Sequence, residues 1–353
     1  MDRRTFISSA IVTTCFAKVS LADNKEVNNA NLQTGIDFQG EKDSTDELQK
    51  IFDYASSLAT KVPNGMQKVL INLNGIVRVS KQLVIDASKV NIVGPLTIIF
   101  SKDGNYKNYG VLLKSHGEGN VSYTNGVGSL FESVNFFSER KINLFFASNT
   151  NTPGCNPSCL INISQCRFTG FAKVFSNGIG GWGWNWDRCG FNECDYLLYL
   201  LKKKDSYERF SFSACIWQNG GTAFYVDNSL GQIYWQSGSF DYCQSVAYIV
   251  NGHVSINGHL EFSDRDSPIV TILGENSSFL FDGGCIFIGK NKGKYNLFEQ
   301  KKHNQVVLNN IKLLTDGVNN DYVSFSNMDV SASNIIYTSE PAREIISKSF
   351  PKS

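Results

Sequence analysis

The chain has 353 residues, of which 42% are apolar, 18% charged and 12% aromatic, and its formal net charge is +1. This composition excludes a disordered chain, a collagen and a small disulfide-bonded knot. The near-neutral charge offers no basic field for nucleic acid or for an anionic membrane surface, and no apolar run is long enough to span a bilayer. Thirty glycines against seven prolines favour many short strands joined by tight turns.

Residues 1–22 have the pattern of an export signal. Arg3 and Arg4 stand before a mildly apolar stretch, and small residues that resemble a cleavage site end at Ala22. The arginine pair, followed by a large apolar residue, resembles a twin-arginine signal; an ordinary secretory signal or a frayed N-terminus is the alternative. We expect residues 1–22 to be removed and residues 23–353 to form one domain in the periplasm or outside the cell.

A helix is expected near the start of that domain. Residues 44–47 have the sequence Ser-Thr-Asp-Glu, which is a capping box. The apolar residues after it fall on one helical face: Leu48, Ile51, Phe52, Ala55, Leu58 and Ala59. We predict that this cap, around residues 44–60, covers an open sheet end, where unpaired strand edges would otherwise invite aggregation. Strands are expected to follow at residues 68–73, 76–79, 83–85 and 96–100.

A short pattern recurs along the rest of the chain with a period of about two dozen residues. It consists of a large apolar residue, a small residue or Cys three positions later, and often an aromatic residue two positions after that. Its clear copies begin at Phe131, Ile163, Trp186, Phe212 and Trp235, and fainter ones at Ile256, Phe281 and Val307. This period, with three short strands per turn, predicts an all-β chain folded as a single-stranded parallel β-helix, because helical solenoids need longer repeats.

The fourth residues of these copies define a column along the predicted helix. They include Cys166, Cys189 and Cys215, and in the fainter copies His259 and Asn310. Equivalent residues stack at roughly 4.8 Å, and a free cysteine behaves as a small apolar residue in an inward column. Nothing adjacent would lower a thiol pKa, so we predict a structural role for the three cysteines.

Cys155 and Cys159 form a separate pair. Their spacing lacks a second pair that would complete a zinc site, and a local disulfide between them is an open alternative in an oxidising compartment. The four histidines are too scattered along the sequence for a metal cluster. We therefore expect no metal site and no cofactor.

The segment around the predicted helix resembles a known family. Gly35 and Asp37 precede the run Asp43–Ile51, which contains a D-x-x-D-x-x-Q helix, and strand-like segments follow at residues 69–77 and 84–94. These features are similar to the opening of the pectate-lyase-like superfamily, including its phage-tailspike branch, although Leu-Asn-Gly replaces the usual Pro-x-Gly. The resemblance implies a right-handed β-helix that most often acts on extracellular polysaccharides. It implies no specific chemistry, because active sites in this superfamily sit on different coils.

Candidate catalytic residues come from the alignment of the coils, since the polygalacturonase motif set is absent and Gly258-His259-Leu260 is its nearest approach. The alignment places three pairs in register on one outward strip: Asn192–Glu193, Gln218–Asn219 and Asp241–Tyr242. Glu193 and Asp241 are then two coils apart, about 9–10 Å, at the edge of the separation of about 6.5–9.5 Å in inverting glycosidases. We predict these two carboxylates as catalytic, with Asp187 as a weaker candidate. The alternative is a solvated row of turn residues.

Predicted substrate-binding residues surround that strip. Gln218 and Asn219 would bind sugar hydroxyls. Strand alternation in residues 180–186 puts three indoles on one face, so Trp182 and Trp184 are predicted to stack on sugar rings, whereas Trp186 aligns with core positions. Arg209 and Tyr242 complete the set, because a lyase needs a base and a group that neutralises a uronate, which Arg209 with Tyr242 or Lys204 would supply.

The sequence therefore predicts an exported protein that binds and cleaves a polysaccharide. A glycoside hydrolase is favoured over a β-eliminating lyase. The alternatives are a non-catalytic carbohydrate-binding or surface-assembly protein, and a sugar epimerase on the same fold. A homotrimer is a possible assembly, and neither nucleic acid nor a membrane span is expected.

Overall fold

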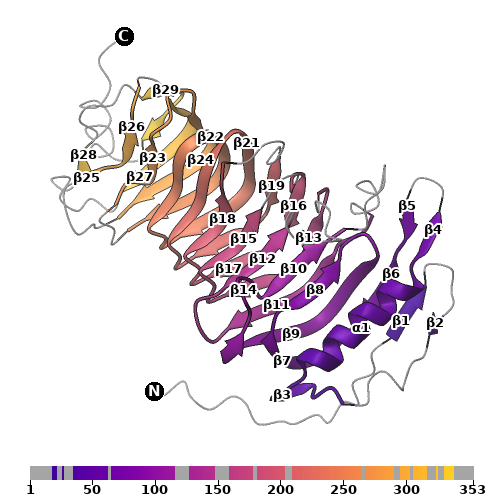
Figure 1. The fold of residues 1–353 in the computed structure, drawn as a ribbon. Coiled ribbons are helices and arrows are strands. Elements are labelled where there is room, and N and C mark those ends of the chain that lie inside the picture. The colour runs from indigo at the N-terminus through magenta and orange to yellow at the C-terminus, as the bar shows by residue number, and fades with distance from the viewer. Residues whose placement is uncertain are drawn as a thin grey trace, which may run out of the picture.

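The structure is a computed structural model of the whole chain (Figure 1). It describes residues 18–21, 26–27, 35–62, 65–115, 127–147, 159–177, 181–202, 209–263, 267–289, 295–302, 305–315, 323–324 and 330–337. Residues 1–17, which carry most of the predicted export signal, and Cys155, one half of the predicted local disulfide, lie outside these ranges. Export and cleavage after Ala22 stay predictions. Lys18–Leu21 forms a strand that pairs antiparallel with residues 69–72.

The chain is almost entirely β-structure. Its strands are β1 (Lys18–Leu21), β2 (Glu26–Val27), β3 (Gln39–Asp43), β4 (Thr60–Val62), β5 (Gly65–Gln67), β6 (Val69–Asn72), β7 (Gly75–Lys81), β8 (Leu83–Asp86), β9 (Val90–Asn105), β10 (Val111–Lys114), β11 (Phe131–Ser138), β12 (Asn143–Ala147), β13 (Asn162–Ser164), β14 (Arg167–Thr169), β15 (Lys173–Asn177), β16 (Trp184–Asp187), β17 (Gly190–Asn192), β18 (Tyr196–Leu200), β19 (Phe210–Ser213), β20 (Ile216–Gln218), β21 (Thr222–Asp241), β22 (Ser245–Phe262), β23 (Val270–Ile272), β24 (Ser278–Ile288), β25 (Tyr295–Asn296), β26 (Phe298–Gln300), β27 (Val306–Thr315), β28 (Val323–Ser324), β29 (Ser331–Ser333) and β30 (Ile336–Tyr337). Parallel pairing repeats from coil to coil: β16, β17 and β18 pair with β19, β20 and β21. The predicted single-stranded parallel β-helix is confirmed.

The interior of the β-helix is filled by aromatic side chains at equivalent positions. Trp186, Phe212 and Trp235 are paired in register across β16, β19 and β21. Their rings stack with centroids 5.8 Å and 5.4 Å apart. Each ring is about 1% exposed. Such offset-stacked rings stabilise the coil-to-coil packing beyond the area that they bury.

The predicted cysteine column is confirmed. Cys166, Cys189 and Cys215 are at most 1% exposed, and the backbone N–H of Cys189 donates to the Sγ of Cys215 at 3.4 Å. Burial raises the pKa of the Cys166 thiol to about 12 and also raises that of the Cys189 thiol. Both thiols therefore stay protonated and unreactive, as the structural role requires.

Two of the three fainter copies, those at Ile256 and Val307, misplace the column residue by one position, whereas the copy at Phe281 is placed correctly. The column continues through Gly238, Gly258, Gly284 and Ile311, not through His259 and Asn310. One residue, Asn257, separates Ile256 from Gly258, whereas two separate the equivalent Trp235 from Gly238. This shorter corner turns His259 away from the core, because a one-residue slip in a strand reverses the face of each side chain.

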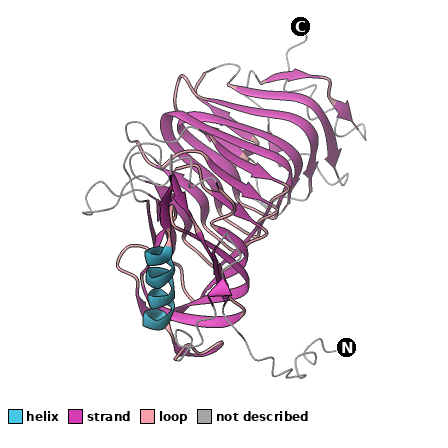
Figure 2. Cartoon of the chain, turned by 90° about the vertical axis from the view of Figure 1, so that its right-hand side faces the viewer, coloured by secondary structure: helices cyan, strands magenta, loops and turns pink. Residues whose placement is uncertain are grey.

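The helix α1 (Thr45–Leu58) covers the N-terminal end, as predicted (Figure 2). It packs against β6, β7 and β8 and buries Leu48, Ile51, Phe52 and Ala55. The capping-box prediction is wrong, because Ser44 makes no side-chain cap and its Oγ accepts from the Asp37 N–H at 2.9 Å. No helix within the described ranges is long and apolar enough to cross a membrane.

Candidate functional site

The outward strip predicted from the coil alignment exists. Asn192, Gln218, Asp241 and Glu261 are paired in register across β17, β20, β21 and β22. The residues that follow the first three, namely Glu193, Asn219 and Tyr242, have φ of 53°, 52° and 54°. A single left-handed residue turns the chain through the corner, and Gly170 does the same one coil earlier. The predicted pairs are therefore corner residues of successive coils.

Glu193 belongs to one part of this strip. It lines an open cavity of about 440 Å³ together with Lys141, Asp195 and Asn219. The Lys141 ammonium donates to Asp195 at 2.7 Å and to the backbone carbonyl of Glu193 at 2.5 Å. The cation of this cavity is thus already paired with a carboxylate of the chain.

Asp241 does not line that cavity, and its carboxylate contacts other side chains. Its carboxylate accepts a hydrogen bond from the Ser239 hydroxyl at 2.8 Å, and its other oxygen lies 4.0 Å from His259 Nε2. The structure therefore gives Glu193 and Asp241 different neighbours. Their role as one catalytic pair, with Gln218 and Asn219 between them, stays a prediction that the geometry does not favour.

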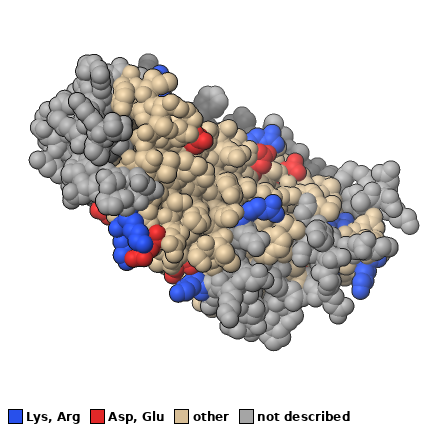
Figure 3. Space-filling model, turned by 90° about the horizontal axis from the view of Figure 1, so that it is seen from above, with Lys and Arg blue, Asp and Glu red and all other residues tan. Residues whose placement is uncertain are grey.

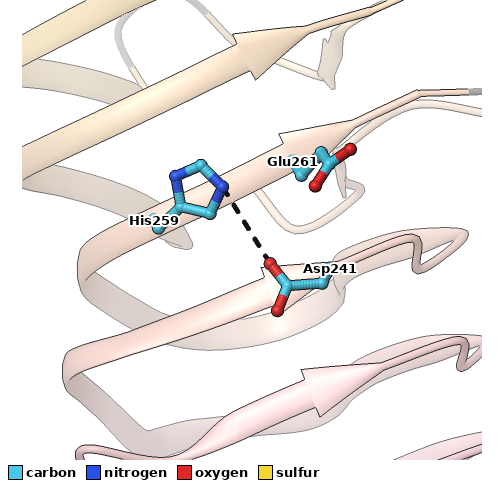
Figure 4. A group of neighbouring side chains, drawn as sticks. All are labelled: Asp241, His259 and Glu261. Atoms are coloured by element: carbon cyan, nitrogen blue, oxygen red, sulfur yellow. Dashed lines mark ion pairs between the residues drawn. The ribbon is translucent and has the colours of Figure 1, made fainter.

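A cluster of Asp241, His259 and Glu261 forms instead on the outward face of β21 and β22 (Figure 4). One ligand atom of each lies within 4.8 Å of the others. The Asp241 and His259 side chains are 22% and 41% exposed, so a ligand can reach them. Three such ligands could hold a metal ion, although exposed groups of this kind are common without one. The adjacent Tyr242 hydroxyl donates a hydrogen bond to Glu261. This hydrogen bond is the main reason why the pKa of Tyr242 is raised.

His259 and Glu261 were missed as site residues by the sequence analysis. The repeat alignment assigned His259 to the inward column, and Glu261 was not aligned with Asp241. The signal that could have found them is alternation within residues 259–262, where Leu260 and Phe262 are buried and the alternating residues His259 and Glu261 face outward.

The predicted sugar stacking is wrong for Trp184, and Trp186 is in the core as aligned. Their side chains are 0% and 1% exposed, and their rings stack on each other inside the β-helix with centroids 5.9 Å apart. The alternation was read correctly for these two, but the shared face is the inner one. Gly183, with φ of +71°, breaks the extended backbone before Trp184. Trp182 is half-buried, and its contact with sugar stays a prediction.

The weaker candidates lie at other positions. Asp187 is in register with Ser213 and Gln236, as aligned, and its carboxylate pairs with the exposed Arg188 at 2.8 Å. Arg209 occupies a different corner, where its backbone carbonyl accepts from the Gly183 N–H. Its predicted partner Lys204 lies outside the described residues. The structure thus gives no support to a uronate-binding pair of Arg209 and Tyr242.

An outward tyrosine ladder was also missed. Tyr199, Tyr225 and Tyr248 are in register on β18, β21 and β22, and their rings stack at 4.4 Å and 5.8 Å. The Lys173 ammonium lies 3.5 Å from the ring centroid of Tyr199. Stacked rings cover each other's faces, so the ladder presents ring edges along the coils. Tyr196, which lines the Glu193 cavity, packs edge-on against Tyr199.

No model of a known protein family matches the chain, and no curated protein sequence matches it. Among solved structures, the enzymatically active domain of tailspike protein 4 from bacteriophage CBA120 is similar, with a TM-score of 0.57 and 15% identity over 86% of this chain. The chain spans 42% of that structure's length. The A-module of mannuronan C-5 epimerase AlgE6 from Azotobacter vinelandii matches with a TM-score of 0.43 and 11% identity, over 86% of this chain and 98% of that one.

The similarity to the tailspike domain confirms the expected fold. The chain is a right-handed parallel β-helix with a helix at its N-terminal end, as the resemblance to the pectate-lyase-like superfamily implied. At this level of identity the likeness concerns the fold and assigns no residue a role.

Proposed function

We propose that the protein is exported and acts on an extended polysaccharide, hydrolysing a glycosidic bond with Asp241 and Glu261. The observation that supports this proposal is the position of these two carboxylates on neighbouring coils, with oxygens within 4.8 Å of each other. Retaining glycosidases hold their two carboxyl groups about 5–5.5 Å apart. The pair therefore favours retention, in contrast to the inverting separation predicted for Glu193 and Asp241.

The contacts of the two carboxylates suit different roles. Asp241 is held by the Ser239 hydroxyl and would attack the anomeric carbon, forming a glycosyl–enzyme ester. Glu261, beside Tyr242, would give a proton to the leaving oxygen. It would then take a proton from the water that hydrolyses the ester, which releases the sugar and regenerates both groups.

The surface beside the pair suits a long, weakly charged ligand. The amides of Asn192, Gln218 and Asn219 lie along the same strip, and the tyrosine ladder runs along the next strand of each coil. Aromatic and amide side chains are the usual ligands of sugar rings and hydroxyls. On the face seen in Figure 3, charged side chains of the described residues lie in small separate groups, several with both signs.

Similar structures place enzymes on this fold. The tailspike domain is described as enzymatically active, which supports a catalytic protein over a purely structural one. The chain covers less than half of that structure. A polysaccharide substrate and a trimeric assembly are therefore proposals for this protein. A periplasmic or extracellular location likewise depends on the predicted signal at residues 1–22.

The test uses the protein without residues 1–22 and a panel of capsular and plant polysaccharides. We expect new reducing ends without the ultraviolet absorbance of an unsaturated uronate, and a first-formed product that keeps the anomeric configuration of the substrate. Glu261→Gln and Asp241→Asn should each lower the rate about 10²–10⁴-fold, because they remove proton transfer or the nucleophile and keep the shape. Glu132→Gln, an outward carboxylate on β11, is the matched control and should retain full activity.

Other outcomes point to the alternatives. An inverted product, together with loss of activity in Glu193→Gln, would restore the pair of Glu193 and Asp241. Absorbance of an unsaturated product would indicate a lyase. An altered sugar composition without new reducing ends would indicate an epimerase. Retention of a polymer without any product would show a binding protein and contradict the hydrolase.

A further inference from the structure

Cys285 differs from the cysteines of the core. Cys166, Cys189, Cys194 and Cys215 are at most 1% exposed, whereas Cys285 is only partly buried. It directly precedes Ile286 on β24, and Ile286 and Ile288 point into the core. Strand alternation therefore turns its thiol outward, onto the face that carries Asp241 and Glu261.

The thiol touches an imidazole. His259 and Cys285 are directly paired across β22 and β24, and His259 Nδ1 lies 2.9 Å from Cys285 Sγ. The other ring nitrogen, Nε2, faces the Asp241 carboxylate at 4.0 Å. With its proton on Nε2, the side that faces the carboxylate, the ring has Nδ1 free to accept the proton of the thiol. Three successive coils thus bring together a thiol, an imidazole in contact with it and a carboxylate 4.0 Å from the second ring nitrogen.

A cation follows in the same column. Lys312 on β27 is paired with Cys285, so His259, Cys285 and Lys312 occupy equivalent positions on β22, β24 and β27. Lys312 is exposed, and its charge lies near enough to act on the Cys285 thiol. An ammonium beside the nucleophile can stabilise the negative oxygen that develops when a carbonyl is attacked.

The contact between the thiol and the imidazole selects the mechanism. His259 Nδ1 lies 2.9 Å from Cys285 Sγ, so the imidazole is placed to remove the thiol proton during the attack. This is general-base activation of the nucleophile, the arrangement found in hydrolases that form acyl–enzyme intermediates.

We propose that Cys285, His259 and Asp241 form a nucleophilic triad that removes acyl groups from ester-linked substituents, with O-acetyl groups on a polysaccharide as the substrate class. The choice of a carbohydrate carrier rests on the proposed function, whereas the thiol chemistry rests on the triad alone. His259 takes the thiol proton while sulfur attacks the ester carbonyl. The C–O bond breaks, and His259 returns the proton to the departing sugar hydroxyl, leaving a thioester. Water, deprotonated by His259, then hydrolyses the thioester to acetate and the free thiol.

The triad is tested with two acyl donors. p-Nitrophenyl acetate should give a burst of nitrophenol and an acetylated Cys285 peptide, detected by mass spectrometry of the quenched protein. O-acetylated xylan should release acetate. Cys285→Ala and His259→Ala should each lower acetate release by at least about 10²-fold, and Lys312→Met should slow thioester formation. Glu132→Gln serves again as the unaffected control.

The outcomes separate this inference from the proposed hydrolysis of glycosidic bonds. Acetate release without new reducing ends would support the triad and contradict the glycosidase, and reducing ends without acetate would do the opposite. Iodoacetamide gives a second measurement in the unmodified sequence, since it should label Cys285 and abolish acetate release while Cys215 stays unlabelled. Equal acetate release by the wild-type protein and Cys285→Ala, or no acetylation of Cys285 by either donor, would overturn the triad.

Discussion

Replacing Cys215 by Asp tests the inward column directly. The Cys215 side chain is 0% exposed. Its Sγ lies 3.5 Å from the carbonyl oxygen of Trp186 and 3.4 Å from that of Ser213. The donor near it is the Cys189 backbone N–H at 3.4 Å. A carboxylate at this position would face two acceptors and one donor without a cation, so the folded protein must keep the new side chain protonated.

The cost of that protonation can be estimated from pKa values. Asp has a pKa of about 3.9 in the unfolded chain, and full burial raises a carboxyl pKa by about 3–5 units. At pH 7, about three pH units above the unfolded pKa, the folded state must still hold this proton. Keeping it bound costs about 4 kcal/mol of the free energy of unfolding. Because the folded-state pKa is raised, the loss of stability grows as the pH rises above about 4 and disappears as the pH falls towards that value.

The assay compares Cys215→Asp with Cys215→Asn, which has nearly the same shape and no charge. Urea unfolding should show Asp less stable than Asn by about 4 kcal/mol at pH 7 and nearly equal to it at pH 4, since both variants share the same overpacking. Equal stabilities of the two variants at pH 7 would mean that position 215 faces solvent. The register of the whole repeat would then be refuted.

Three further predictions address other parts of the fold. Lys68 is 7% exposed, and burial lowers its pKa to about 7, so the unfolded state binds more protons between pH 7 and about 10.4. Stability should therefore rise across that range by up to about 1.4 kcal/mol per pH unit in urea unfolding, and Lys68→Met should abolish that slope. Gly258→Ala should lower the melting temperature strongly, because φ is +142° and a methyl group would overlap the Gly238 carbonyl oxygen; an unchanged value would contradict this close approach. Gln49→Ala removes two side-chain hydrogen bonds to the Val84 backbone, of 2.8 Å and 2.9 Å, and should cost about 1–3 kcal/mol in the same unfolding assay, whereas no change would show that they contribute nothing.

The fold was predictable because the repeat is carried by large side chains. Copies such as Trp186–Phe191 and Phe212–Trp217 place aromatic residues at fixed offsets, and those residues are the ones that stack in the core. The capping-box prediction was wrong for a reason that residue spacing alone cannot show. Ser44 has the right position in the sequence, but its hydroxyl accepts from Asp37, a residue brought near by the turn before β3.

The tryptophans show a limit of strand alternation. Alternation states that Trp184 and Trp186 share a face, but it does not state which face points inward. The neighbouring coil decides: Trp184 and Trp186 are paired with Phe210 and Phe212, which are buried as well. A glycine-rich segment with large aromatic residues is therefore compatible with a close-packed interior, where small residues leave room for large ones.

The candidate site itself depends on one missing residue. In most coils two residues separate the core aromatic from the column residue, but between Ile256 and Gly258 only Asn257 remains. An alignment at constant spacing puts His259 inside the β-helix, where an imidazole would have no function. The shorter corner shifts the following strand by one position, and this turns His259 outward beside Asp241 and Cys285.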